Sequence, residues 1–210
     1  PKPNGKWRFC IDYRSLNDCS ASAGWPLPNI FEMLQRLGRR KARWFAVMDL
    51  TSGYHQAPLS KNSQEESAFI TCMGVFVWQR VPMGLKGATS YFQQQMPSHV
   101  LSGLMYNTCE AYLDDIITYG SSEQECLANL RKVFERFRSH GLTLNPNKCK
   151  IGLPSIEYVG HIIDATGITF SQEKRESILN FPLPDTHRDM KKFLGLINYF
   201  HDHTRNHSIV

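Results

Sequence analysis

Two adjacent aspartates lie in the middle of an apolar run, Tyr112-Leu113-Asp114-Asp115-Ile116-Ile117. Neighbouring carboxylates repel each other, and in a half-buried hairpin the pKa of one of them would rise unless a cation neutralised the pair. Divalent ions with oxygen ligands, Mg²⁺ above all, are the natural partners of such a pair. A simpler interpretation is an Asp-rich turn that connects two strands. The pair alone does not separate these two alternatives.

A third carboxylate, Asp49, ends another β-rich run over residues 44–50. If this run and the one that carries Asp114 and Asp115 form neighbouring strands, the three carboxylates converge. Two metal ions about 3.5–4 Å apart could then clamp the attacking and leaving oxygens of an in-line phosphoryl transfer. The sequence therefore predicts a two-metal site for phosphoryl transfer.

Proline and glycine divide the chain into the elements that must position these carboxylates. We predict strands at 7–12, 44–50 and 112–119, and hairpins at 68–78 and 156–170. We predict helices at 30–37, at 86–105 with a break at Pro97, at 122–140, and from 171 onward with breaks at Pro182 and Pro184. The linkers between strands are often too short for parallel crossovers. We therefore expect an α+β fold, with a largely antiparallel sheet and helices on one face.

The helix over 122–140 has the clearest pattern in the sequence. Ser122 and Glu125 form a capping box, and Gly141 ends the helix. Its apolar stripe is expected to face the core and consists of Leu127, Leu130, Phe134 and Phe137.

The composition is that of a globular chain with a mild basic excess. Its 210 residues are 41% hydrophobic and 20% charged, and the formal net charge is +5. This charge permits a nucleic-acid partner without requiring one. The six cysteines include no Cys-x-x-Cys pair, and no run of 18 apolar residues is present, so we expect a reducing, cytoplasmic-type location and no membrane segment. The chain begins without methionine, which we interpret as the sign of a fragment.

Several ordered motifs resemble those of reverse transcriptases, and their amino-acid sequences are most similar to those of gypsy-type long-terminal-repeat retrotransposons. Tyr112-Leu113-Asp114-Asp115 resembles the Tyr-x-Asp-Asp signature, and Val47-Met48-Asp49-Leu50 with Thr51-Ser52-Gly53-Tyr54 resembles the first metal-binding motif. The other matching blocks, in family order, start at Trp7, Trp25, Val81, Tyr158 and Phe193. The resemblance covers essentially the whole chain and identifies it as the reverse transcriptase (RNA-directed DNA polymerase) part of a pol polyprotein.

The resemblance implies a right-hand polymerase palm and fingers with the start of a helical thumb. The expected division is fingers at 1–48, palm at 49–163 with a fingers insertion at about 60–85, and the end of the primer-grip hairpin plus a partial thumb at 164–210. The implied partners are an RNA template, a DNA primer and a deoxynucleoside triphosphate. RNase H, integrase and protease domains are expected in the same polyprotein, and the implied location is the cytoplasm, within a virus-like particle.

The resemblance also implies roles for individual residues. Two Mg²⁺ ions, for which Mn²⁺ can substitute, would be held by Asp49, the carbonyl of Leu50, Asp114 and Asp115. Tyr54 would be the gate that excludes ribonucleotides, and the other nucleotide-binding residues would be Lys2, Arg8, Ser52, Gly53, Met83 and Gly84. The template and primer would contact Tyr112, Tyr158, Val159, Gly160 and His161.

The chain departs from the family pattern at Met83, Thr89 and Pro97, as a decaying copy of an element would. An alternative function is therefore a catalytically inactive or domesticated palm that binds nucleic acid. A third possibility, an RNA-copying RNA polymerase with a similar palm, is disfavoured by Tyr54. Basic and histidine residues elsewhere carry weaker signals: we expect Lys148, Lys150 and the histidines at 201, 203 and 207 to be solvated, and we leave open whether Arg39, Arg40, Lys41 and Arg43 touch a phosphate backbone.

Overall fold

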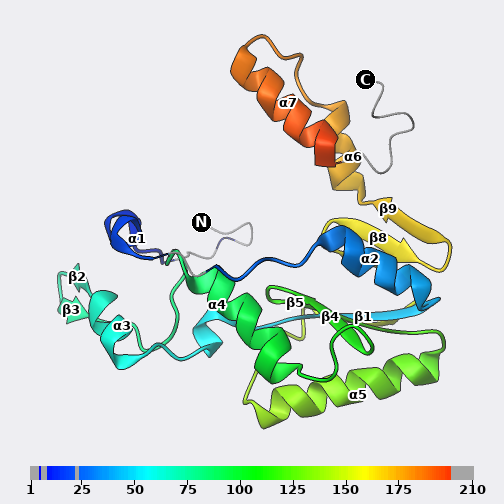
Figure 1. Cartoon of the computed structure of the whole chain (residues 1–210), viewed down its shortest axis with the longest axis horizontal. Helices are drawn as coiled ribbons and strands as arrows, with labels where there is room; N and C mark the ends of the chain where they lie inside the picture. Colours follow the sequence, from blue (N-terminus) through cyan, green and yellow to red (C-terminus); the bar gives the residue numbers. More distant parts are fainter. Residues whose placement is uncertain (1–4, 6–8, 22–23, 200–210) are drawn as a thin grey trace.

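The computed structural model describes residue 5 and residues 9–21 and 24–199 (Figure 1). At its centre is a four-stranded sheet with the strand order β4-β5-β1-β6. Its strands are β4 (Cys109–Tyr112), β5 (Asp115–Gly120), β1 (Trp44–Asp49) and β6 (Lys150–Leu153). Every pairing in this sheet is antiparallel, which confirms the predicted α+β class.

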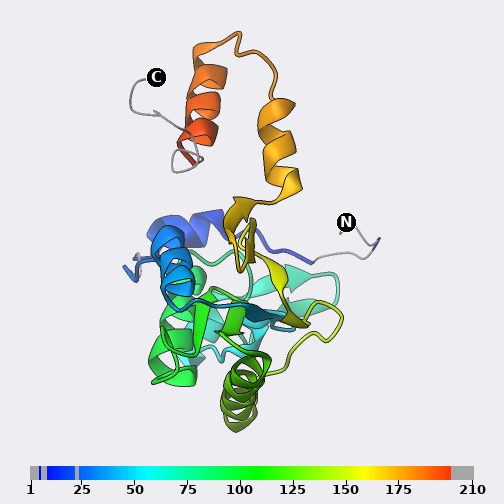
Figure 2. The ribbon, with the colours of Figure 1, turned by 90° about the vertical axis from the view of Figure 1, so that its right-hand side faces the viewer.

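The alternation of side chains along β1 and β5 gives the sheet two buried faces. Ala46, Met48 and Ile116 point to one face, where α4 (Ala88–Gln95) and α5 (Glu123–Ser139) cover them. Phe45 and Ile117 point to the other face, which is covered by α2 (Ile30–Arg39) and the sheet β7-β8-β9. Figures 1 and 2 show α2 and α5 on opposite sides of the central sheet. The prediction that helices cover only one face was therefore wrong.

Helix α5 begins as predicted, but a different stripe of it faces the core. The Ser122 hydroxyl accepts a hydrogen bond from the Glu125 N–H, and Gly141, which follows the C-cap residue His140, has a φ of +67°. Leu127 and Phe134, which were predicted to be buried, are exposed. The buried face consists of Cys126, Asn129, Leu130, Val133 and Phe137.

Pro97 interrupts α4, as the sequence predicted, although the chain continues as a π-helical turn at Met96–Val100. Proline has no N–H to donate and its ring crowds the preceding turn, so a regular α-helix cannot pass through it unchanged. Met96 and Val100 are nevertheless buried in the core beside the central sheet.

A smaller group of elements lies at one end of the molecule (Figure 1). It comprises α1 (Arg14–Cys19), α3 (Lys61–Glu66) and the hairpin of β2 (Phe69–Thr71) and β3 (Gly74–Phe76). The hairpin was predicted, whereas the two short helices were not. The strand predicted over 7–12 is not formed at residues 9–12, and residues 7 and 8 lie outside the described part.

The C-terminal part begins with β7 (Ser155–Tyr158), β8 (His161–Asp164) and β9 (Gly167–Phe170), which form an antiparallel sheet. The predicted hairpin over 156–170 therefore contains a second tight turn, at Val159 and Gly160, which both have positive φ. Helices α6 (Gln172–Leu179) and α7 (His187–Tyr199) follow and extend away from the central sheet (Figure 2). Within the described residues, no helix has both the length and the apolar character that crossing a bilayer requires.

Candidate active site

The two adjacent aspartates lie at a hairpin turn, because the run predicted as one strand over 112–119 is divided between β4 and β5. Tyr112 pairs with Asp115, and Leu113 and Asp114 make the turn between them. Leu113 has a φ of +56°, a left-handed conformation that a leucine rarely adopts. Asp114 thus lies in a turn between strands, the alternative that was left open, whereas Asp115 is the first residue of β5.

A buried glutamine holds this turn from behind. The Gln93 side chain on α4 is 1% exposed, and its Oε1 accepts a hydrogen bond of 2.7 Å from the Leu113 N–H. Its Nε2 donates to the carbonyl of Ala111, at 3.5 Å. Both partners are distant in sequence, so the residue pattern gave no signal of this contact. Gln93 stabilises the unusual backbone at Leu113, since an unpaired buried N–H is costly.

Asp49 lies directly opposite Asp115, because the two residues are the last pair in the register of β1 and β5. Burial, followed by the nearby carboxylates of Asp114 and Asp49, raises the pKa of Asp115 to about 6. The three predicted carboxylates are therefore close enough to influence one another. Among the described residues, no three His, Cys, Asp or Glu side chains are arranged to ligate one ion as they stand.

Lys148 pairs with Asp49, although its side chain is 62% exposed, as expected of a solvated lysine. Its Nζ donates to Asp49 Oδ2 over 2.8 Å, and this hydrogen bond raises the pKa of Lys148. A turn that begins at Asn145 positions this lysine. The Asn145 N–H donates to the carbonyl of Asp49 at the end of β1, and the Lys148 N–H donates to the carbonyl of Asn145. Lys148 is the nearest positive charge to the carboxylates that the described contacts contain.

The segment after Asp49 folds back against the aspartate hairpin. Leu50 is buried and Ser52 adopts a left-handed conformation, after which residues Gly53–Gln56 form a 3₁₀ helix. A Cβ atom at Gly53 would lie 2.9 Å from the Cβ of Asp114, so only glycine fits this approach. The Tyr54 ring is half-buried and packs against Phe92 at 5.3 Å between centroids.

The predicted nucleotide-side turn at Met83 and Gly84 lies between β3 and α4. Met83 is half-buried, and Gly84 is exposed with a φ of +99°. A side chain at position 84 would be strained by this backbone conformation. The glycine therefore allows the chain to turn sharply just before α4.

The predicted primer-side hairpin touches the aspartate hairpin directly. The Tyr158 hydroxyl donates to the carbonyl of Asp115 over 3.3 Å, and Tyr158 is 2% exposed. Val159 and Gly160 form the turn beside it, and the buried His161 begins β8. The β7–β8 turn is thus fixed against the same strand that carries Asp115.

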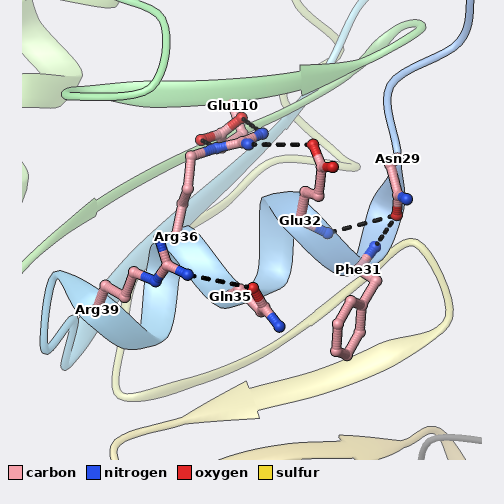
Figure 3. Close-up of polar contacts among 7 residues, drawn as sticks. All are labelled: Asn29, Phe31, Glu32, Gln35, Arg36, Arg39 and Glu110. Carbon is pink, nitrogen blue, oxygen red and sulfur yellow. Dashed lines mark hydrogen bonds and ion pairs between the residues drawn. The ribbon is translucent and has the colours of Figure 1, made fainter.

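A buried ion pair connects α2 with the aspartate hairpin (Figure 3). Arg36 on α2 forms two hydrogen bonds with the Glu110 carboxylate on β4, of 2.8 and 3.0 Å. The Glu110 side chain is 1% exposed, and burial raises its pKa although Arg36 opposes the shift. The Arg36 guanidinium also lies over the Tyr106 ring, 4.8 Å from its centroid. The charged pair was missed because its members are 74 residues apart.

Some predicted residues lie outside the described part of the chain. These are Lys2, Arg8 and the histidines at 201, 203 and 207. Met83 and Gly84 lie in the separate turn before α4. The remaining predicted site residues fall into two neighbouring groups around the ends of β1, β4 and β5: the segment 49–54 with the aspartate hairpin, and the β7–β8 turn that Tyr158 attaches to it.

Comparisons of this chain with known proteins agree on one family. A family model described as "Reverse transcriptase (RNA-dependent DNA polymerase)" matches residues 1–163. The chain is 35% identical over 201 residues to the "Retrovirus-related Pol polyprotein from transposon 412" of Drosophila melanogaster. The matched residues make up 96% of the chain and 16% of that polyprotein. It is 32% identical over 197 residues to the Pol polyprotein from transposon gypsy of the same organism, covering 94% of the chain and 19% of the polyprotein. The chain thus spans less than a fifth of each of these two relatives.

The fold resembles solved structures of the foamy viral protease-reverse transcriptase. A complex of its dRH form with double-stranded DNA has a TM-score of 0.88 and 27% identity, over 99% of this chain and 36% of that one. A complex with an RNA/DNA hybrid has a TM-score of 0.75 and 26% identity, over 96% of this chain and 26% of that one.

Proposed function

Because the chain belongs to the reverse transcriptase family, we propose that it adds deoxynucleotides to a primer 3′-hydroxyl on an RNA or DNA template by two-metal-ion catalysis. One observation supports the chemistry above all: Asp49 and Asp115 face each other at the end of paired strands, with Asp114 in the adjoining turn. This is an arrangement in which acidic side chains from separate segments can share divalent ions.

The donor set fits Mg²⁺ or Mn²⁺. Carboxylate oxygens of Asp49, Asp114 and Asp115, with the Leu50 carbonyl, are the hard ligands that these ions prefer. The raised pKa of Asp115 indicates negative charge that a cation would relieve. When bound, the ions would supply Lewis-acid activation of the primer hydroxyl and neutralise charge on the triphosphate. Lys148 would give up its bond to Asp49 as ions bind, and its exposed side chain leaves it free to move.

The nucleotide would lie between the segment 52–54 and the turn at Met83 and Gly84. The Tyr54 ring, supported by Phe92, would lie under the sugar and clash with a 2′-hydroxyl. Backbone N–H groups at Ser52 and Gly53 would face the triphosphate. Arg8 and Lys2 would contact its phosphates, for which a planar guanidinium is well suited.

The growing duplex would contact Tyr112 and the β7–β8 turn at 158–161. The contact of Tyr158 with Asp115 supports this, because it fixes the turn close to the carboxylates that act on the primer end. The foamy viral relatives hold double-stranded DNA or an RNA/DNA hybrid, so duplexes of both kinds are proposed here. Contacts to phosphates and sugars make binding indifferent to sequence and weaker at high salt.

The polyprotein relatives support a proposal about the wider setting of this unit. We infer that RNase H, integrase and protease act beside this unit in the same polyprotein. Synthesis would then take place in the cytoplasm within a virus-like particle, where the RNA template is packaged.

Primer extension tests the proposal. The chain is incubated with poly(rA), oligo(dT), dTTP and Mg²⁺, and an Asp114→Asn variant serves as the matched control. We expect incorporation by the unaltered chain and none by the variant. Binding of the primer–template without incorporation would instead support an inert nucleic-acid-binding palm.

A further inference from the structure

One side chain on α1 holds the nucleotide-side turn by two hydrogen bonds. The Asn17 Nδ2 donates to the Gly84 carbonyl over 2.8 Å, and the Asn17 Oδ1 accepts from the Lys86 N–H over 2.7 Å. These two backbone groups flank the turn that follows Met83. The asparagine amide therefore satisfies a donor and an acceptor at once, as a neighbouring strand would.

The side chain of Lys86, which follows this turn, in turn contacts the end of α1. The Lys86 Nζ donates to the backbone carbonyls of Asn17, at 3.4 Å, and Ser20, at 3.1 Å. The end of α1 and the turn are thus joined by four hydrogen bonds between residues 66 to 69 positions apart. The position of the turn depends on α1.

The segment before α1 continues this connection toward the β2–β3 hairpin. The Tyr13 ring is buried and lies 3.7 Å from the position of a Cβ on Gly84. Its hydroxyl donates to the carbonyl of Ser67, and the Ser67 hydroxyl accepts from the Trp78 N–H. Movement of the hairpin would therefore reach Gly84 through Tyr13 and α1.

We propose that Asn17 is a positioning residue that holds the Met83–Gly84 turn in the form that accepts the incoming nucleotide. This inference rests on the proposed polymerase function and extends it to a residue with no direct part in the chemistry. Only an amide of this length supplies both the donor for Gly84 and the acceptor for Lys86. An aspartate keeps the acceptor but places a negative oxygen against the Gly84 carbonyl, and an alanine removes both hydrogen bonds.

Steady-state incorporation of one nucleotide by the full 210-residue chain tests the role. We expect Asn17→Ala to raise the KM for the nucleotide about tenfold, as the loss of two hydrogen bonds at the turn would. The kcat is expected to stay within about twofold, and the Kd for primer–template to stay unchanged, because neither metal ligands nor duplex contacts are altered. Asn17→Asp, which has nearly the same volume, is expected to raise the KM at least as much.

Ser60→Ala is the matched control, since it removes the hydroxyl that caps α3 nearby and does not touch the turn. An Asn17→Ala enzyme with an unaltered KM would overturn the proposal. So would an equal rise of KM in Ser60→Ala at an equal loss of thermal stability, because Asn17 would then serve the fold alone.

Amide exchange separates this inference from the proposed function. The Lys86 N–H is expected to exchange about tenfold faster in Asn17→Ala than in the unaltered chain, with or without catalysis. If the unaltered chain incorporates no nucleotide, the polymerase proposal fails, and Lys86 exchange still decides whether Asn17 holds the turn. Unchanged exchange at Lys86 would contradict the positioning role whatever the activity. If Asn17→Ala does not fold, Asn17→Asp provides the comparison of KM values, because it removes the donor to Gly84 and keeps the acceptor for the Lys86 N–H.

Discussion

At the scale of single residues, the negative charges of the three clustered carboxylates are neutralised to different extents. Lys148 neutralises Asp49 through a direct hydrogen bond, and its own side chain is 62% exposed. Asp115 has no such partner among its described contacts, and burial together with Asp114 and Asp49 raises its pKa from 3.8 to about 6. Between these two values the folded chain binds a proton that the unfolded chain releases, so stability falls as pH rises through this window.

Replacement of Asp115 by asparagine should therefore stabilise the chain at neutral pH without divalent ions. We expect Asp115→Asn to raise Tm by about 2–4 °C at pH 7.5, since a gain of roughly 1 kcal/mol remains after allowance for solvent screening. The gain should shrink as the pH falls through this window and vanish below about pH 3, where Asp115 is protonated in both states. Thermal unfolding followed by circular dichroism at the two pH values measures the difference.

Asp185→Asn is the matched control for this experiment, because Asp185 is an exposed aspartate far from the carboxylates in sequence. It should leave the Tm unchanged at both pH values. A lower Tm for Asp115→Asn at pH 7.5 would mean that the ionised carboxylate stabilises the fold. The same variant should lose incorporation, because an amide is a poor ligand for Mg²⁺.

Tyr54 allows the sugar preference to be tested at one position. Its ring packs on Phe92, so Tyr54→Val removes the surface proposed to meet a 2′-hydroxyl. We expect discrimination against ribonucleotides, measured as the ratio of kcat/KM values, to fall by about tenfold or more. Tyr54→Phe keeps the ring and should keep the preference. An unaltered preference in Tyr54→Val would remove the gate assignment.

At the scale of elements, α2 and β4 are joined by a charged pair inside the protein (Figure 3). Arg36 reaches the Glu110 carboxylate with two donors, and Glu32 on the same helix approaches its guanidinium at 3.9 Å. Glu110 stands in the strand that leads to Tyr112 and the aspartate turn. A change in this pair is therefore expected to affect the position of the hairpin.

Loss of one partner should cost more than loss of both. Arg36→Leu leaves a buried carboxylate without its cation and should lower the free energy of unfolding by about 3–5 kcal/mol. Arg36→Leu combined with Glu110→Leu should recover much of that loss, because no unpaired charge remains. Urea unfolding measures the three values, with Arg39→Ala as a control on the exposed side of the same helix. Equal losses in the single and double variants would contradict this account.

The close approach of the 3₁₀ helix to the aspartate hairpin can be tested by adding one methyl group. Gly53→Ala would place its Cβ 2.9 Å from the Cβ of Asp114, so the hairpin must shift. We expect kcat to fall at least about tenfold, since small displacements of reacting groups are costly. Gly38→Ala adds the same group within α2, where nothing lies within 4 Å, and should retain activity with slightly greater stability. Full activity in Gly53→Ala would show that this contact does not position Asp114.

Elements with strong periodicity were predicted, and those that depend on distant partners were not. The apolar run of β1 and the capping box of α5 are local signals, and both elements formed within a residue or two of their predicted limits. The six-residue helices α1 and α3 bury none of their residues, so no stripe marked them. The apolar residues on both sides of the aspartate pair concealed the turn, which depends on the positive φ of Leu113.

The residues of the candidate site also divide into those with a local sequence signal and those that depend on distant partners. The clustering of Asp49 with the aspartate pair could be predicted, because each ends or interrupts a strand run. Lys148 and Gln93 could not, since their partners lie 99 and 20 residues away and neither carries a local motif. Charge balance and backbone support at the site are thus tertiary properties.

At the scale of the whole molecule, α6 and α7 extend from the rest as a separate arm (Figure 2). Helix α6 buries none of its residues, and Leu179 and Leu183 are 81% and 88% exposed. A chain shortened to residues 1–170 should therefore keep its Tm within about 2 °C, because little packing is lost. Its Kd for primer–template should rise severalfold if the arm follows the duplex, as measured by fluorescence anisotropy. A fall in Tm of more than about 5 °C would show that the arm stabilises the central sheet.

The π-helical turn at Met96–Val100 gives the chain a local tolerance to a change in length. A wide turn holds one residue more than an α-helical turn would, so the loss of a single residue such as Ser98 is taken up inside the turn. The residues on either side then keep their orientation, and Leu101 stays fully buried against the central sheet. A one-codon deletion here should consequently be far milder than one within α5, where every later side chain of the helix would rotate by about 100° around the helix axis.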